Sequence, residues 1–129
     1  RGHPAAESGD RAMATLKTLR TRELGDGKVS VAAPEIVIDG RPTYTTWLQD
    51  ESQGGKVRTG VWEATPGLTK SAKGGKFEFC HILSGVLVVT GDDGQTATYR
   101  AGDAFLSPAG FTGTWDVVET VRKQFAFYE

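Results

Sequence analysis

Turn-forming residues recur at short and even intervals along this chain, and their spacing limits the fold more than any other feature. Glycine, proline or aspartate stand together at residues 54–55, 66–67 and 91–94, between segments rich in β-branched and aromatic side chains. Turns of this kind join antiparallel strands. We therefore expect an all-β fold, either a sandwich or a barrel, made of about nine short strands. The expected strands are residues 35–38, 43–49, 57–65, 77–83, 86–90, 95–100, 104–107, 111–118 and 122–128. The polar, glycine-rich residues 69–75 are expected to form a loop.

The composition fits one small globular domain. The chain has 129 residues, with 17 glycines and 38 % hydrophobic residues, which favours short strands and many turns over long helices. Its net charge is −1 and its basic residues are scattered, so we expect no nucleic-acid partner and no binding to a membrane surface. No apolar run reaches the ~18 residues that span a bilayer. The single cysteine, Cys80, cannot form an internal disulfide, so we expect a cytoplasmic protein.

Two motifs in the second half of the chain decide between a sandwich and a barrel. The first, EFCHILSG at residues 78–85, places a glycine seven positions after Glu78. The second, GDAFLSPAG at residues 102–110, places Pro-x-Gly after a glycine and five further residues. Together with GVWEATPG at residues 60–67 and GFTGTWDVVETVRK at residues 110–123, these motifs resemble the cupins. They are most similar to the branch of small cupins that includes the ethanolamine-utilisation protein EutQ and the cupin domain of (S)-ureidoglycine aminohydrolase.

The resemblance implies a single-domain jelly-roll β-barrel (RmlC-like) of two antiparallel sheets, and it implies a homodimer. We assign residues 35–129 to the cupin barrel and residues 13–34 to an N-terminal arm. Residues 1–12 are polar and lack periodicity, and they precede Met13, the only methionine. We interpret them as a tag remnant or a disordered extension, with Met13 as the native start.

The resemblance also shows where the chain departs from the family. Cupins commonly bind a metal through histidines, and those positions fall here on Ser71, Lys73 and Gly113. A catalytic metal site needs about three protein ligands, and His81 is the only histidine of the domain. We therefore predict no metal site and no cofactor. A divalent ion held loosely by water and backbone oxygens, or by Glu78 and a cysteine, is the alternative.

Strand alternation identifies two charged side chains that face the barrel interior. If Glu78 points inward, Cys80 points inward with it and His81 points outward. Burial would raise the pKa of Glu78 and suit it to general acid or base catalysis, or a buried cation would neutralise it. Lys123 shares its face with apolar residues, where an unpaired ammonium is costly. It either pairs with Glu78 or awaits an anionic ligand.

Aromatic residues complete the predicted site. Gly113 stands at a former histidine position on the same face as Trp115, which predicts room for a ligand beside the indole. Tyr44 is a further ligand-binding candidate, with packing in the core or a dimer interface as the alternative. Cys80 is either an inert buried thiol or a ligand contact, because an apolar site raises the pKa of a thiol.

These observations favour a cupin-fold protein that binds a small polar or anionic metabolite without the usual metal. Glu78 and Lys123 are the catalytic candidates, and Trp115, Cys80, Tyr44 and Gly113 are the ligand-binding candidates. Two alternatives stay open at this point. One is a metabolic enzyme of the amidohydrolase, isomerase or lyase type with an atypical metal site. The other is a non-catalytic accessory protein that acts through its dimer surface.

Overall fold

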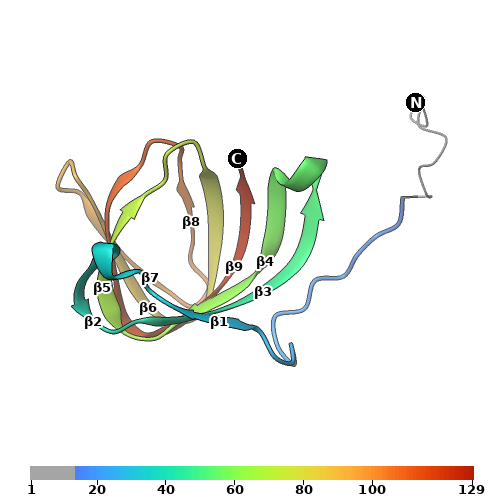
Figure 1. The fold of residues 1–129 in the computed structure, drawn as a ribbon, viewed down its shortest axis with the longest axis horizontal. Coiled ribbons are helices and arrows are strands. Elements are labelled where there is room, and N and C mark those ends of the chain that lie inside the picture. Colours follow the sequence, from blue (N-terminus) through green and yellow to red (C-terminus); the bar gives the residue numbers. More distant parts are fainter. Residues whose placement is uncertain (1–13) are drawn as a thin grey trace.

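The computed structural model describes residues 14–129, and strands make up nearly all of their regular secondary structure (Figure 1). No helix among them is long and apolar enough to cross a membrane. The predicted extension at residues 1–12 lies outside the described residues. Within the described part, the chain forms nine strands and two 3-10 turns. They are β1 (Lys28–Val31), η2 (Pro34–Ile36), β2 (Val37–Gly40), β3 (Thr43–Ser52), η3 (Gln53–Gly55), β4 (Val57–Ala64), β5 (Gly67–Ala72), β6 (Phe77–Gly91), β7 (Thr96–Arg100), β8 (Ala104–Ser107) and β9 (Thr112–Tyr128).

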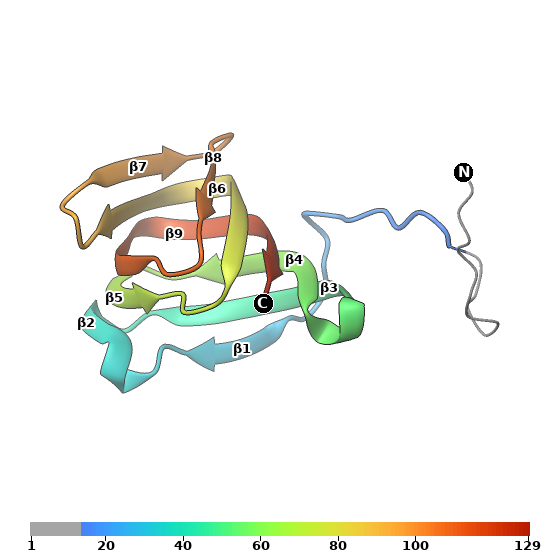
Figure 2. The same ribbon diagram turned by 90° about the horizontal axis from the view of Figure 1, so that it is seen from above.

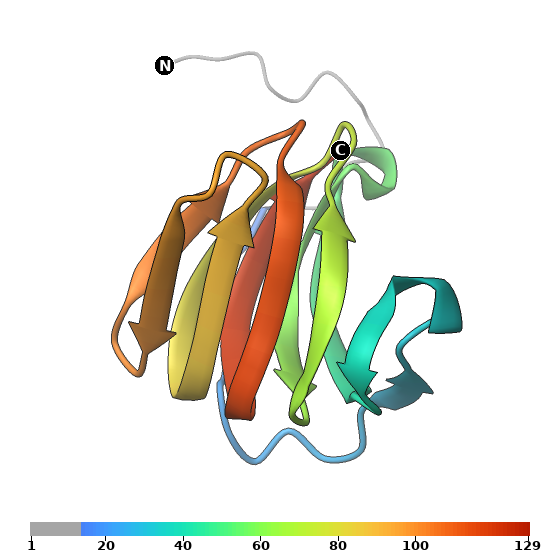
Figure 3. The same ribbon diagram turned by 90° about the vertical axis from the view of Figure 1, so that its left-hand side faces the viewer.

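All strand pairs are antiparallel, and the hydrogen-bond ladder joins all nine strands into one curled sheet. The strand order β1-β3-β4-β9-β5-β2 forms one path, and β6 pairs with β7, β8 and β9. Figures 2 and 3 show these strands curving around a common interior. The two sheets expected for the barrel are therefore halves of one continuous sheet.

Two strands are much longer than the sequence pattern predicts. β6 has 15 residues and β9 has 17, where the pattern predicted two short strands for each. The expected break near Gly85 is a set of register shifts inside one strand. Gly85 has a φ of 88°, and a Cβ there would collide with the carbonyl oxygen of Thr120. A bulge therefore bends β6 without ending it.

The predicted loop at residues 69–75 is wrong in its first half. β5 runs through Ala72 and pairs with β2 on one side and with β9 on the other. Its side chains are polar, so the sequence lacked the apolar signal of a strand. The pairing of its backbone on both sides gives the segment its extended structure. β1 lies inside the predicted N-terminal arm and pairs with β3.

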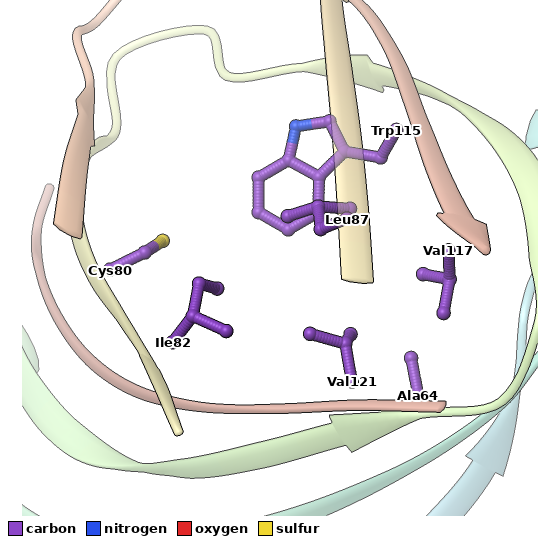
Figure 4. Packing of buried hydrophobic residues seen from close by; sticks show 7 residues of the cluster. All are labelled: Ala64, Cys80, Ile82, Leu87, Trp115, Val117 and Val121. Atoms are coloured by element: carbon purple, nitrogen blue, oxygen red, sulfur yellow. The ribbon is translucent and has the colours of Figure 1, made fainter. Parts of the chain in front are cut away.

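The hydrophobic core fills one part of the interior. Its members come from β4, β6 and β9 and point toward one another in Figure 4. They are Ala64, Cys80, Ile82, Leu87, Trp115, Val117 and Val121. Full burial of a valine, leucine or isoleucine side chain stabilises a fold by about 1.5–3 kcal/mol. This cluster therefore stabilises the curled sheet, and polar groups lie in the region beside it.

Candidate functional site

A cavity of about 380 Å³ lies on the inner face of the curled sheet, beside the apolar core. Its walls carry aromatic rings, four lysines and one glutamate. The lining residues that the following paragraphs use are Tyr44, Trp62, Thr69, Lys70, Lys73, Lys76, Glu78, Trp115, Lys123 and Phe127.

The alternation of β6 and β9 places the charged groups in this cavity. Glu78, Cys80 and Ile82 are buried, whereas Phe79 between them is exposed and His81 is half-buried. The predicted facing of β6 is therefore confirmed, and the histidine stands on the opposite face from the carboxylate. On β9, Lys123 lies directly opposite Trp62 of β4 and Ile82 of β6.

Glu78 is held between two ammonium groups. Its Oε2 accepts a hydrogen bond of 2.7 Å from Lys123 Nζ, and its Oε1 accepts one of 3.0 Å from Lys73 Nζ. The side chains of Glu78, Lys123 and Lys73 are only 7 %, 5 % and 12 % exposed. The predicted pairing of Lys123 with Glu78 is thus confirmed, but the carboxylate has a second partner.

Of the two alternatives for Glu78, a pKa raised by burial and neutralisation by a buried cation, the structure agrees with the second. Burial acts to raise this pKa, but the charges of Lys123 and Lys73, with their hydrogen bonds, outweigh it and lower the pKa to about 2. Glu78 is therefore a stable carboxylate at neutral pH, which makes it a weak base and leaves it no proton to donate.

Lys123 remains an ammonium. Burial acts to lower its pKa, but Cys80 and Glu78 act in the opposite sense, and the net direction is upward. Its Nζ also stands 4.4 Å from the ring centroid of Trp62 and 4.3 Å from that of Trp115. Such contacts favour a cation over an aromatic face. The two indoles and the carboxylate thus enclose the charge.

Lys73 is the functional residue that sequence reasoning missed. It follows β5 in a turn, where its own N–H donates to Phe111 and its carbonyl accepts from Lys76. Its Nζ stands 4.6 Å from the ring centroid of Trp115. Burial lowers the pKa of Lys73, the charge of Lys123 adds to that effect, and Glu78 opposes it. The sequence contained one indication that Lys73 faces the interior, because the resemblance places a metal-ligand position of the family on this residue.

Two of the predicted ligand-binding residues lie outside the cavity lining. Cys80 is fully buried behind Lys123, with Sγ 3.7 Å from Nζ, and burial raises the pKa of its thiol to about 11. The room expected at Gly113 does not exist, because a Cβ there would collide with the carbonyl oxygen of Thr90. Gly113 instead allows β9 to approach Gly91 of β6 closely.

The other two predicted ligand-binding residues line the cavity. Trp115 is 6 % exposed, and its Nε1 is buried with no hydrogen-bond partner among the described residues. Tyr44 packs against Trp62 at 5.0 Å between ring centroids and shares a hydrogen bond with Thr69. Burial raises the pKa of Tyr44, so its hydroxyl keeps its proton. Both residues therefore contribute an aromatic surface and a neutral polar group.

The residues of this site do not fit the divalent metal that the family resemblance implies. Both carboxylate oxygens of Glu78 already accept from ammonium groups, and those two cations would repel a metal ion. Within residues 14–129, no group of three or more His, Cys, Asp or Glu side chains is arranged to hold a metal. That the protein binds no metal and no cofactor stays a prediction, which elemental analysis tests.

Comparisons with known proteins agree with the observed fold. Residues 51–125 match the family model of the EutQ-like cupin domain. No curated protein matches the chain. A protein of unknown function from Pseudomonas syringae pv. tomato, of the DUF861 family, is 26 % identical with a TM-score of 0.75, over 84 % of this chain and 46 % of that one. This chain therefore spans about half the length of that protein.

Two more distant structures share the fold alone. The EutQ protein of Clostridium difficile is 16 % identical with a TM-score of 0.60, over 67 % of this chain and 63 % of that chain. A predicted oxalate decarboxylase of Thermotoga maritima is 17 % identical with a TM-score of 0.62, over 87 % and 98 %. The predicted jelly-roll fold is confirmed by these likenesses and by the strand topology. The chain belongs to the family of EutQ-like cupin domains.

Proposed function

We propose that this protein binds a small anionic metabolite in the cavity. The observation that carries the proposal is the charge of the lining, where four lysines face one glutamate. The lining thus carries three positive charges in excess, although the side chain of Lys70 is exposed to solvent. An excess of positive charge attracts an anionic ligand, and the low-dielectric walls of a cavity strengthen that attraction.

The shape and the walls of the cavity support a ligand that is partly flat. About 380 Å³ lies within the usual range for small-molecule sites. Trp62 and Trp115 pack edge to face with ring centroids 6.1 Å apart, and the indole N–H of Trp115 is a free donor within the described part of the chain. Lys76 stands over the ring of Phe127 at 4.4 Å and supplies a cation near the same wall. A planar carboxylate or a phosphate with a flat body suits this combination.

The two alternatives receive less support. A pKa of about 2 at Glu78 does not suit the general acid–base step of an amidohydrolase, isomerase or lyase. An accessory role would use the outer surface, where Phe79 and Leu106 form an exposed cross-strand pair. Homodimer formation and a cytoplasmic location stay predictions, as does the absence of nucleic-acid and membrane partners.

Calorimetric titration with benzoate and with its uncharged isostere benzamide tests the proposal. We expect benzoate to bind and benzamide to bind at least roughly tenfold more weakly, since a hydrogen bond to a charged group contributes about 1.5–3 kcal/mol. Lys76→Ala should weaken benzoate binding by a similar factor. Lys56→Ala is the matched control, because Lys56 is exposed and lies outside the cavity lining. Equal binding of the two ligands would refute an anion site, as would no effect of Lys76→Ala together with a loss on Lys56→Ala.

A further inference from the structure

Two buried lysines share one carboxylate, which leaves the cluster with a positive charge in excess. The Nζ atoms of Lys73 and Lys123 each lie within 3.0 Å of an oxygen of Glu78. One carboxylate neutralises one ammonium, and the second ammonium then adds an uncompensated charge to a site largely closed to water. Loss of a proton from one lysine relieves this repulsion. The cluster therefore makes it easier for one of the two lysines to give up a proton than it is for an isolated lysine.

The surroundings decide which lysine becomes the amine. Lys123 is enclosed by Glu78, the thiol of Cys80 and the faces of two tryptophans, all of which favour its charged form. Lys73 lies in a turn at the cavity wall and is the more exposed of the two. A lysine that is desolvated beside another cation is an activated nucleophile. Lys73 meets this description, and its amine borders the space that a ligand would enter.

We infer that Lys73 forms a Schiff base with a small anion that carries an aldehyde or ketone group, such as a 2-oxo acid. This inference rests on the proposed anion site and names the chemical class of its ligand. In the step, the Nζ lone pair attacks the carbonyl carbon, a C–N bond forms and the C–O bond breaks. Counted from the ammonium form, two of the three protons on nitrogen leave with the carbonyl oxygen as water. The third stays on the iminium nitrogen, so charge is conserved and neither oxidant nor reductant is needed.

The groups around Lys73 fit each part of this reaction. The Glu78 carboxylate, which pairs with the ammonium, would pair equally with the positive iminium. Lys76 lines the same cavity and supplies a cation for the carboxylate of the ligand. Trp115 offers an aromatic face and an indole N–H that has no partner among the described residues. Covalent capture of this kind is reversible, because water can hydrolyse the iminium.

Reductive trapping tests the inference on the full chain. The protein is incubated with pyruvate and sodium cyanoborohydride, and the reduced adduct is counted by intact mass and located by peptide mapping. We expect a single adduct on Lys73, formed at least tenfold faster with pyruvate than with its uncharged methyl ester. Lys73→Arg keeps the positive charge but has no amine that can form a Schiff base, so it should lose the adduct. Lys56→Arg is the control, since Lys56 is exposed outside the cavity and its replacement should leave trapping unchanged.

The outcomes separate this inference from the proposed function. An adduct on Lys123 or on surface lysines alone would overturn the role of Lys73, as would trapping that persists in Lys73→Arg. Benzoate binding without any pyruvate adduct would overturn the Schiff base and leave the anion site standing. Failure of both benzoate binding and trapping would overturn both. Peptide mapping of the adduct on the protein without substitutions identifies the modified lysine even if Lys73→Arg folds poorly.

Discussion

The same two strands build two very different parts of the interior. Where β6 and β9 direct Ile82, Leu87 and Val121 inward, the side chains pack without a gap and are fully buried. Further along the same strands, Glu78 and Lys123 point inward, and a cavity lies beside them. Both parts belong to the same antiparallel pair of strands, and the bulge of β6 lies between Ile82 and Leu87. The change from apolar to charged side chains accompanies the change from a packed core to a cavity.

The two parts also differ in how their stability depends on partners. Apolar burial is favourable for each side chain by itself. A buried charge is tolerated only while an opposite charge stays beside it, since desolvation costs several kcal/mol per ion. The stability of the apolar part should consequently depend on the volume of its side chains, and the stability of the charged part should depend on its balance of positive and negative charges. Four measurements can sharpen or break this contrast.

The largest effect is expected from Glu78→Gln. This substitution keeps the shape but leaves two buried ammonium groups without an anion, so we expect a loss of about 3–5 kcal/mol in the free energy of unfolding. Urea denaturation at pH 7 measures it. Glu51→Gln is the control, because the exposed pair of Glu51 with Arg58 contributes at most about 1 kcal/mol. If both variants lose the same small amount of unfolding free energy, the buried ion pairs are no more important for stability than the exposed one.

Ile82→Ala should come next, with a loss of about 3 kcal/mol from the lost transfer energy and the space left behind. Ile82 is fully buried and lies opposite Lys123, so it marks the border between the two parts. The loss should be the same at pH 4 and pH 7, because no proton is involved. A loss that depends strongly on pH would show that the apolar core and the charged cluster are not separable.

Acid should weaken the charged part only. The folded-state pKa of Glu78 is about 2 and its ordinary value is 4.5, so the unfolded chain binds the proton more tightly. The stabilisation is fully present above about pH 4.5 and is lost as the pH falls through 2, by roughly 3 kcal/mol in total. Denaturation curves between pH 2 and 6 should show this slope, and it should be reduced in Glu78→Gln. An unchanged slope in the variant would assign the acid sensitivity to other carboxylates.

Lys123→Met should have the smallest effect on stability. It leaves Glu78 with Lys73 as one neutral pair and replaces the ammonium by an apolar side chain between two indoles, so we expect a change of about 1 kcal/mol or less. Benzoate affinity should fall, because the cavity loses a cation. A loss of stability as large as that of Glu78→Gln would mean that Lys73 cannot neutralise Glu78 alone.

Strand periodicity was enough to predict that Glu78 and Lys123 face inward, and it left two alternatives for Lys123, a pair with Glu78 or an anionic ligand. The structure has the pair. The fold was predicted from the resemblance of several motifs to the cupins, and periodicity alone did not distinguish a barrel from a sandwich.

Such reasoning could not predict the contact of Lys73 with Glu78 or the close backbone approach at Gly113. Lys73 lies in a turn with no periodicity, and its approach to Glu78 depends on how β5 is held against β9, which the sequence did not reveal. The direction of the pKa of Glu78 stayed open for the same reason, because strand alternation does not show how many cations lie beside the carboxylate. Gly113 was interpreted as vacated space, whereas the tight approach of two backbones already fills it.

The length of β6 and β9 has a consequence for how the molecule opens. Each strand runs as one element past both the apolar core and the charged cluster, although register shifts between Ile82 and Leu87 interrupt the regular pairing of β6 with β9. Local opening at the cavity would therefore disturb the backbone of the same two strands that hold Ile82 and Leu87 in place. Amide hydrogen exchange in the two parts should therefore report one cooperative unit. A ligand bound to the lysines would then slow exchange at the distant apolar end of the same strands as well.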